Sequence, residues 1–300
     1  MGWRVTTTGP WRRPQRDNTA PWIPTSRHSG PMTVVHLLSG LGGVARLTEL
    51  VAAGTGRAAI TKACDRGQVL RVARDIYALP NHDPAVVDAL RLGVELACVS
   101  AAHHRGLWIL RQPGLMHVAT DHGRQIGTAG LRVHRAARPA TDLVVCLQVM
   151  RCLPELDALC IVESAVVRGA VTLDDLREHV VGHRSGALRR IVALIDPQAE
   201  SILETVARYR LLEAGFHVAS QVQVSGVGRL DLVVDGVLGV EADGREYYSD
   251  RRAFEEDRRR WNLLTARGMP VLRVTWSLLQ RDPDTFIRLV RAALEAHSAP

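Results

Sequence analysis

Long apolar runs are missing from this 300-residue sequence. No stretch approaches the ~20 apolar residues that a membrane-spanning helix needs, and the longest runs are short pieces such as Leu143–Leu147 and Val237–Val240. Residues 1–31 also lack the apolar central region of a secretory signal. We therefore expect a cytoplasmic protein that does not enter a membrane.

Cysteines are few, and no two of them form a C-x-x-C pair. They are odd in number and far apart: Cys64, Cys98, Cys146, Cys152 and Cys160. This usage argues against a disulfide framework and against a zinc ribbon, because both rest on recurrent cysteine pairs. We expect free, mostly buried thiols in a reducing compartment.

Lysine is almost absent, since Lys62 is the single lysine among 38 Lys and Arg residues. Any mechanism that needs a lysine at another position is thereby excluded. The net charge of +7 suits a polyanion partner such as DNA, but residues 195–300 hold more carboxylates (16) than basic side chains (14). An acidic segment within a basic protein indicates either a site where carboxylates are gathered or a solvated helical face.

The N-terminal part of the sequence is typical of a tail followed by a winged helix-turn-helix. Residues 1–31 mix Pro, Gly, Trp and Arg without periodicity, so we expect disorder there, and translation starts at either Met1 or Met32. Three short apolar-faced segments follow, and the third is expected to begin with Thr55 as its N-cap. Two β-type runs then flank a polar turn at Arg74-Asp75. We assign residues 32–82 to this DNA-binding domain.

Two further domains complete the expected organisation. Residues 83–195 mix helix-like and strand-like runs, which predicts an α/β connector domain. Residues 196–300 follow the order α-β-β-β-α-β-α, with clear turn signals between the segments. The predicted fold class is therefore a multidomain protein of mixed α/β and α+β architecture.

Three carboxylates interrupt the apolar strands of the last domain. Asp231 lies in RLDLVV, and Glu241 and Asp243 lie in GVEADG. A carboxylate in a core strand normally becomes neutral, pairs with a base or binds a cation, because burying it as an unpaired charge is costly. Hard oxygen ligands of this kind suit Mg²⁺ or Mn²⁺. The alternative is a solvated edge at which these acids pair with Arg229, Arg245 and neighbouring arginines.

The turn at Asp235-Gly236 decides whether Asp231 can join Glu241. A strict two-residue loop would make Asp231 face away from Glu241. A three-residue loop that begins at Val234 would place Asp231 opposite Gly239, on the same face as Glu241. We predict an odd-length loop or a bulge.

The helices of this domain offer further polar candidates. Glu200 and Glu204 are four residues apart and so lie on one helix face, from which either can act as a ligand or orient a water. Arg258 and Arg259 of a later, long helix can meet phosphates. In both cases the alternative is an exposed helix face.

Residues 198–293 resemble the restriction-endonuclease-like PD-(D/E)XK superfamily, and within it the very-short-patch-repair-like endonuclease family of largely uncharacterised function. The resemblance rests on ESILET, Gln221, GRLDLVV, VEADGREYYSDRRAFEEDRRRWNLL and VLRVTW. It implies a Mg²⁺- or Mn²⁺-dependent DNA endonuclease with Asp231 and Glu241 as the metal-binding carboxylates and Glu204 as the helix acid. Asp243 stands where the superfamily has its lysine, and Tyr248 stands where this family often has histidine; both are added to the catalytic candidates.

Residues 33–80 resemble the winged-helix domain of AbiEi-like antitoxins from type IV toxin–antitoxin systems. The resemblance rests on GGVARLTEL, on the helix around AAITKACDRG and on VLRVARDIYAL. A winged helix would offer its third helix to the major groove and its hairpin to flanking phosphates, and the candidate DNA-binding residues are Arg57, Thr61, Lys62, Arg66, Arg71 and Arg74. A protein-interaction role for these helices stays open.

Two functions remain. The first is a metal-dependent DNA endonuclease or nicking enzyme that its N-terminal domain brings to DNA, with a possible repair partner. The second is a non-catalytic, antitoxin-like transcriptional regulator with a cognate toxin. Convergence of Asp231, Glu241 and a helix glutamate within metal-sharing distance would favour the first.

Overall fold

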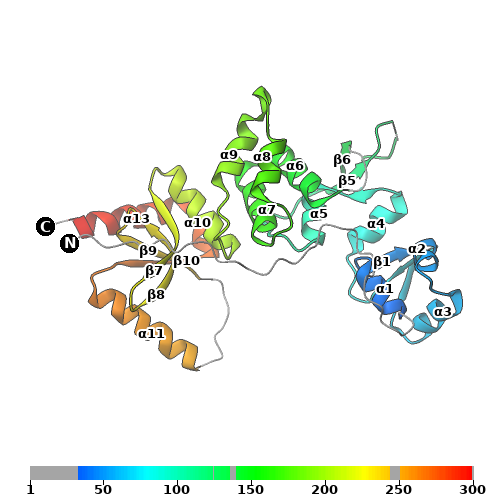
Figure 1. Cartoon of the computed structure of the whole chain (residues 1–300), viewed down its shortest axis with the longest axis horizontal. Helices are drawn as coiled ribbons and strands as arrows, with labels where there is room; N and C mark the ends of the chain where they lie inside the picture. Colours follow the sequence, from blue (N-terminus) through cyan, green and yellow to red (C-terminus); the bar gives the residue numbers. More distant parts are fainter. Residues whose placement is uncertain (1–32, 124, 136–139, 244–250, 299–300) are drawn as a thin grey trace. The chain divides into compact units, whose positions relative to one another are not determined.

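The computed structural model describes residues 33–123, 125–135, 140–243 and 251–298 (Figure 1). The chain divides into two compact units, with the boundary between Leu153 and Pro154. The segment predicted as a connector, residues 83–195, is divided between them: residues 83–153 belong to the first unit and residues 154–195 to the second. The predicted tail, residues 1–31, lies outside the described residues.

The first unit begins with three short helices and an antiparallel sheet of strand order β1-β3-β2 (Figure 1). The elements are α1 (Val34–Gly40), β1 (Val44–Arg46), α2 (Leu47–Ala52), α3 (Arg57–Asp65), β2 (Leu70–Ala73) and β3 (Ile76–Ala78). The buried side chains of Leu38, Leu50 and Ile60 pack the helices together. This arrangement confirms the predicted winged helix-turn-helix.

The start of α3 differs from the prediction. Its N-cap is Gly56, which has no side chain to accept a hydrogen bond, while Thr55 is buried. The backbone N–H of Thr55 donates to the carbonyl of Leu50 at 3.1 Å and so closes the end of α2. Thr55 therefore serves the preceding helix and the core instead of capping α3.

The rest of the first unit is a small mixed sheet with helices. Its elements are α4 (Pro84–Leu92), β4 (Glu95–Leu96), α5 (Cys98–His104), β5 (Met116–Thr120), β6 (Leu131–Arg135) and α6 (Asp142–Cys152). The strand order is β4-β5-β6, with β4 antiparallel and β6 parallel to β5. Helix α4 ends at Leu92 because Gly93 takes a left-handed conformation, with φ of 66°.

The second unit contains a helical part followed by the predicted α-β-β-β-α-β-α succession. Its elements are α7 (Glu155–Val167), α8 (Leu173–His179), η1 (His183–Ser185), α9 (Gly186–Leu194), α10 (Ile202–Glu213), β7 (Val218–Val224), β8 (Gly228–Val234), β9 (Leu238–Asp243), α11 (Arg251–Ala266), β10 (Val271–Thr275), α12 (Trp276–Arg281) and α13 (Pro283–Ser298). The short helix α12 was not predicted. None of the described helices is both long enough and apolar enough to cross a membrane.

The sheet of the second unit has the strand order β10-β9-β8-β7. β7, β8 and β9 are antiparallel neighbours, and β10 runs parallel to β9. Helices α10 and α13 lie together on one side of this sheet, and α11 lies on the other side (Figure 1). Leu264 of α11 packs against Leu230 and Val233 of β8, which fixes the helix over the sheet.

A buried ion pair fastens α7 to α10. Glu163 accepts hydrogen bonds from the Thr205 hydroxyl at 2.6 Å, from Arg208 Nη2 at 2.5 Å and from the backbone N–H of Asp196 at 2.6 Å. Burial raises the pKa of Glu163, and the Arg208 guanidinium opposes that rise. This network positions α10, whose first turn reaches the candidate site.

Candidate functional site

The β8–β9 hairpin places Asp231 and Glu241 on one face of the sheet. Leu232 of β8 pairs with Val240 of β9. Since successive side chains of a strand point to opposite faces, the next residues outward, Asp231 and Glu241, share the other face. The register therefore agrees with the predicted same-face arrangement, which stays a prediction for the two side chains.

The loop of this hairpin has an odd length, as predicted, but a different composition. Val234 pairs with Leu238, so the three residues between them are Asp235, Gly236 and Val237. Asp235 and Gly236 both have positive φ, 48° and 72°, a conformation that an Asp-Gly pair adopts readily in a tight turn. The register is consequently shifted by two residues from the predicted one, which brings Asp231 level with Glu241.

Asp231 is half-buried and held by the neighbouring strand. Its Oδ2 accepts a hydrogen bond from the backbone N–H of Ala242 at 2.9 Å. Burial raises the pKa of Asp231, whereas the Ala242 N–H and the charges of Arg229 and Arg260 lower it. The carboxylate thus lies in a partly desolvated position where a cation would stabilise its charged form.

Glu241 is paired with an arginine from α11. Arg260 Nη2 lies 3.0 Å from Glu241 Oε1, and the same nitrogen donates to the carbonyl of Arg229 at 2.7 Å. Both charged side chains of the pair are less than a quarter exposed. The alternative in which a neighbouring arginine pairs with an acid of this site is therefore realised at Glu241, where the arginine is Arg260; Arg245 lies outside the described residues.

Glu204 occupies the first turn of α10 and is buried. Its Oε1 accepts from the Ser201 hydroxyl at 2.8 Å, and its Oε2 accepts from the Glu200 N–H at 2.9 Å and from Gln221 Nε2 at 2.8 Å. Burial raises the pKa of Glu204, those hydrogen bonds lower it, and the nearby charge of Asp231 raises it further. Because both oxygens already accept hydrogen bonds, Glu204 fixes the start of α10 and holds Gln221.

The predicted convergence of three carboxylates is not observed among the described residues, where no three acids lie close enough to share one ion. The physical reason is that two of these carboxylates already have partners in the protein. Arg260 pairs with Glu241, and Glu204 is engaged by the α10 cap and by Gln221. Glu200, predicted to share a helix face with Glu204, precedes the N-cap Ser201 and so lies outside α10; it pairs with Arg229 at 2.7 Å.

Gln221 brings a buried side-chain oxygen close to Glu204 and to strand β8. It lies on β7 across from Asp231, between the pairs Ser220–Leu232 and Val222–Leu230, and its φ of 52° is unusual for a residue with a side chain. Its Oε1 is buried and has no hydrogen-bond partner. Such an oxygen is unfavourable by about 1–3 kcal/mol unless water or a cation meets it. With Asp231 and Glu241 it forms a set of hard oxygen donors that fits a divalent cation such as Mg²⁺.

Several other candidates lie at the edge of this region. Asp243 ends β9 and pairs through its backbone with Thr275 of β10, but its side chain, like the whole of Tyr248, lies outside the described residues. Arg258 and Arg259 are exposed on α11.

The candidate DNA-binding residues of the first unit share one property, which is exposure. Ile60 and Ala63 bury one side of α3, while the other side faces solvent. The exposed residues on α3, at its end and on the hairpin are Arg57, Thr61, Lys62, Arg66, Arg71 and Arg74. Asp75 lies 3.9 Å from Arg74 and offsets part of the positive charge at the turn of the hairpin.

Comparisons with known families agree with both domains. Residues 32–80 match a family described as transcriptional regulator, AbiEi antitoxin. Residues 204–294 match the family REase_MTES_1575, a restriction-endonuclease-like domain. The C-terminal domain is restriction-endonuclease-like. Its match spans α10 to α13 and so includes Glu204, Asp231 and Glu241.

Comparisons with whole proteins are less informative. No curated protein matches the chain. A crystal structure of the RV2827C protein from Mycobacterium tuberculosis is 20% identical and covers 60% of this chain and 74% of that one, at a TM-score of 0.21. A likeness at that score does not establish a shared fold. The restriction-endonuclease-like domain belongs to a class that generally depends on a divalent metal, and the AbiEi-like domain indicates DNA binding.

Proposed function

We propose that the protein binds DNA through its winged helix and hydrolyses a phosphodiester bond in its restriction-endonuclease-like domain. The observation that supports this proposal best is the placement of Asp231 and Glu241 on one face of the sheet, beside the unpartnered buried oxygen of Gln221. A restriction-endonuclease-like domain needs such a set of oxygens at the strand ends. The cofactor that we propose is Mg²⁺ or Mn²⁺.

Asp231, Glu241 and Gln221 are the residues that would hold the ion. When bound, a divalent ion polarises the scissile phosphate and lowers the pKa of an attacking water. Glu204 acts as a positioning residue, because its carboxylate holds the amide of Gln221 at 2.8 Å. Arg260 is placed by the carbonyl of Arg229 so that its positive charge lies beside Glu241, where a phosphate would also meet it.

The remaining candidates act on the proton and on the phosphates in this proposal. The domain has no lysine, so deprotonation of the attacking water would fall to a metal-assisted transfer to a second water, or to a side chain such as Tyr248. Asp243 and Tyr248 stay the candidates for that role. Arg258 and Arg259 supply exposed positive charge on α11 for the DNA backbone.

A supercoiled-plasmid nicking assay tests the proposal. Wild-type protein with Mg²⁺ or Mn²⁺ is expected to convert the plasmid to the nicked form, and a chelator is expected to stop it. Asp231→Asn should lower the rate by more than ~100-fold. Loss of a residue that only hydrogen-bonds to a metal ligand typically costs about 10- to 100-fold, and this change removes a charged ligand itself.

The matched control is Asp235→Asn, which removes the same charge from the other end of the same hairpin. Asn tolerates the positive φ of position 235, so the turn is retained. If Asp231→Asn nicks as fast as wild type, the activity comes from a contaminant or another site. If wild-type protein cleaves no DNA with either metal, the catalytic half of the proposal is wrong.

A second candidate function, a non-catalytic antitoxin-like regulator, is favoured by one observation. Arg260 lies beside Glu241 and neutralises its charge, which a bound metal ion would otherwise do. A protein of this kind would bind DNA with equal affinity in the presence and absence of Mg²⁺ and would not nick it. A toxin encoded nearby would then be the partner, whereas a nuclease would act with repair proteins. Either role is one for the cytoplasm, which is the location that we propose.

A further inference from the structure

Two cysteines and two histidines meet in the first unit, far from the restriction-endonuclease-like domain in sequence. Cys98 begins α5, His117 lies on β5, His134 lies on β6 and Cys152 ends α6. One ligand atom of each residue lies within 4.8 Å of the ligand atoms of the other three. His117 Nδ1 is 3.2 Å from His134 Nε2, and Cys152 Sγ is 3.9 Å from His117 Nδ1.

These separations are those of a tetrahedral zinc site. With Zn–N bonds of about 2.05 Å and Zn–S bonds of about 2.3 Å, the edges of a Cys₂His₂ tetrahedron are about 3.3 Å (N–N), 3.6 Å (N–S) and 3.8 Å (S–S). The N–N separation of 3.2 Å and the N–S separation of 3.9 Å are close to these edges. The four side chains therefore already form a cluster of the size that one zinc ion requires.

The fold supplies all four ligands from fixed positions. β5 and β6 are parallel, and His117 pairs with Arg132. His134 is two residues beyond Arg132, so both histidines point to the same face of the sheet. Helices α5 and α6, which carry the cysteines, pack against each other. Four ligands from two strands and two helices are placed as a structural metal site needs them.

The backbone at Cys98 is strained in a way that points to a ligand. Cys98 is fully buried and has a φ of 48°, a conformation that costs a residue with a side chain of order 1–3 kcal/mol. Its N–H donates to Gln148 Oε1 at 2.9 Å, which holds it in this position. A bond from the thiolate to a metal would offset the strain.

The charges of the cluster also fit a divalent ion. Two thiolates balance the charge of Zn²⁺, so the bound site is neutral and tolerates the nearby Arg132. A neutral imidazole is the form of histidine that binds a metal, and a coordinating thiol is deprotonated by the ion that it binds.

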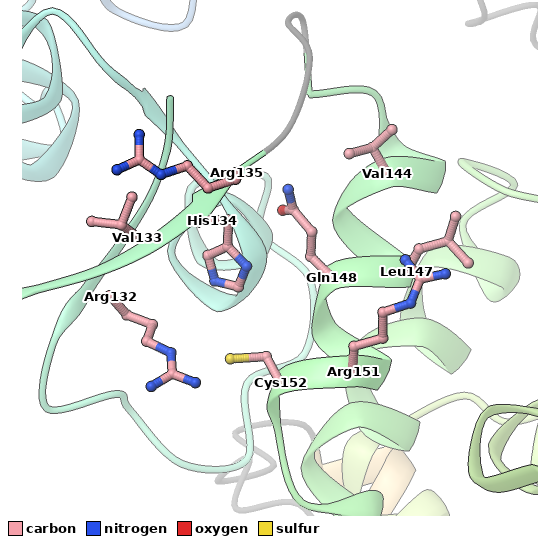
Figure 2. Close-up of a pocket in the computed structure, with 9 residues that line it drawn as sticks. All are labelled: Arg132, Val133, His134, Arg135, Val144, Leu147, Gln148, Arg151 and Cys152. Carbon is pink, nitrogen blue, oxygen red and sulfur yellow. The ribbon is translucent and has the colours of Figure 1, made fainter. Parts of the chain in front are cut away.

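The cluster has an open side. His134 and Cys152 line a pocket between β6 and α6, together with Arg132 and Gln148 (Figure 2). Figure 2 shows the ring of His134 and the sulfur of Cys152 pointing into the same space. An ion can therefore reach the ligands from solvent.

We propose that Cys98, His117, His134 and Cys152 bind one Zn²⁺ in a four-ligand structural site that joins β5 and β6 to α5 and α6. The proposal revises the expectation that the cysteines are only core thiols. It is independent of the nuclease proposal, because none of its ligands belongs to the restriction-endonuclease-like domain.

The metal content of the purified full-length protein is the first test. Protein made without chelators should hold about one zinc per chain, as a structural Cys₂His₂ site does. Cys152→Ala and His134→Ala should each lose the metal. Cys64→Ser removes a half-buried thiol outside the cluster and should keep it. Zinc that persists in both ligand variants would overturn the proposal.

Titration of the reduced, metal-free protein with Co²⁺ is the second test. The four-ligand site should give the visible absorption of tetrahedral cobalt and a sulfur-to-cobalt charge-transfer band. Wild-type protein that gives neither signal would overturn the proposal. The same holds for freshly prepared protein that contains a Cys98–Cys152 disulfide and still binds no Co²⁺ after that disulfide has been reduced.

A ligand exchange keeps the test decisive if an alanine variant fails to fold. His134→Cys retains four ligands and adds a third thiolate, so the protein should still bind one Co²⁺ with a stronger charge-transfer band. An unchanged band would show that residue 134 does not touch the metal and would contradict the assignment.

Discussion

At the scale of single residues, the buried charged groups of the second unit are those whose removal we expect to change the free energy of unfolding most. Glu163 is fully buried and Arg208 is nearly so; they lie 2.5 Å apart, and Glu163 also accepts hydrogen bonds from the Thr205 hydroxyl and the Asp196 N–H. Burying two charges costs desolvation free energy, and their mutual attraction offsets that cost only while both are present. Removal of either partner leaves an unpaired buried charge next to the first turns of α10.

We expect Arg208→Met to lower the free energy of unfolding by about 3–5 kcal/mol, the usual result of breaking a buried pair. Urea denaturation followed by circular dichroism measures the change. The double variant Glu163→Gln/Arg208→Met should regain part of the loss, because position 163 no longer carries an unpaired buried charge. Asp196, whose Oδ2 lies 3.8 Å from Arg208 Nε, still loses that partner, so the recovery should be partial. Arg190→Met removes an exposed arginine that pairs with Glu155 and Glu213 and should change little. Equal losses in the two single variants would contradict the argument.

The residues at the restriction-endonuclease-like site show a similar dependence on contacts far apart in sequence. The apolar strand around Asp231 was enough to predict that its carboxylate becomes neutral, pairs with a base or binds a cation. The Arg260–Glu241 pair and the hydrogen bonds that engage Glu204 were not predictable, because they join α11 to β9 and α10 to β7. Gln221 entered the prediction only through a resemblance. Its role as an oxygen ligand emerged from its buried, unpartnered Oε1.

At the scale of elements, α8 offers a test of a local rule. Thr172 is its N-cap: the hydroxyl accepts from the Asp175 N–H at 3.0 Å, and Asp175 Oδ2 accepts from the Thr172 hydroxyl at 2.6 Å and from its N–H at 3.1 Å. The Thr172 hydroxyl and N–H lower the pKa of Asp175. The folded protein therefore favours the charged carboxylate more than the unfolded chain does.

The sign of the pH dependence follows from that lowered pKa. The stabilisation from Asp175 is present above the pKa that an aspartate has in the unfolded chain, and it is lost as the pH falls through the lower folded-state value. Asp175→Asn should thus destabilise the protein at pH 7, and its difference from wild type should vanish in strong acid. Urea titrations at both pH values measure this. Asp174→Asn, one residue earlier and outside the cap, should leave the capping bonds intact; an equal effect there would contradict the prediction.

Elements were predicted best where their signals are local. The winged helix and the α-β-β-β-α-β-α order follow from apolar periodicity and from turn residues such as Asp235-Gly236. A boundary that depends on packing was missed: Thr55 is buried and leaves the N-cap of α3 to Gly56.

At the scale of the whole molecule, the two units make separable contributions. Lys62 is exposed on α3 in the first unit, and Asp231 lies in the second. Lys62→Ala should weaken DNA binding and lower the salt dependence by about one unit of slope, the loss of one phosphate contact. The nicking rate at saturating DNA should not change.

Asp231→Asn should do the reverse, with DNA affinity kept and nicking lost. Fluorescence anisotropy over a range of salt concentrations and the plasmid assay measure the two effects in the same preparations. If Lys62→Ala alters the saturated rate, or if Asp231→Asn alters the salt slope, the two functions are coupled and the prediction fails.

The sequence by itself determined the kinds of domain, their order and the chemistry on offer: a helix-turn-helix with basic side chains, then strands that carry carboxylates. Those features depend on periodicity and on residue type, which are properties of neighbouring residues. The tertiary structure decided which side chains meet. A shift in one hairpin brings Asp231 level with Glu241, and two strands and two helices gather Cys98, His117, His134 and Cys152 from segments without any shared motif. The distances between such groups depend on strand register and helix packing, which no local pattern specifies.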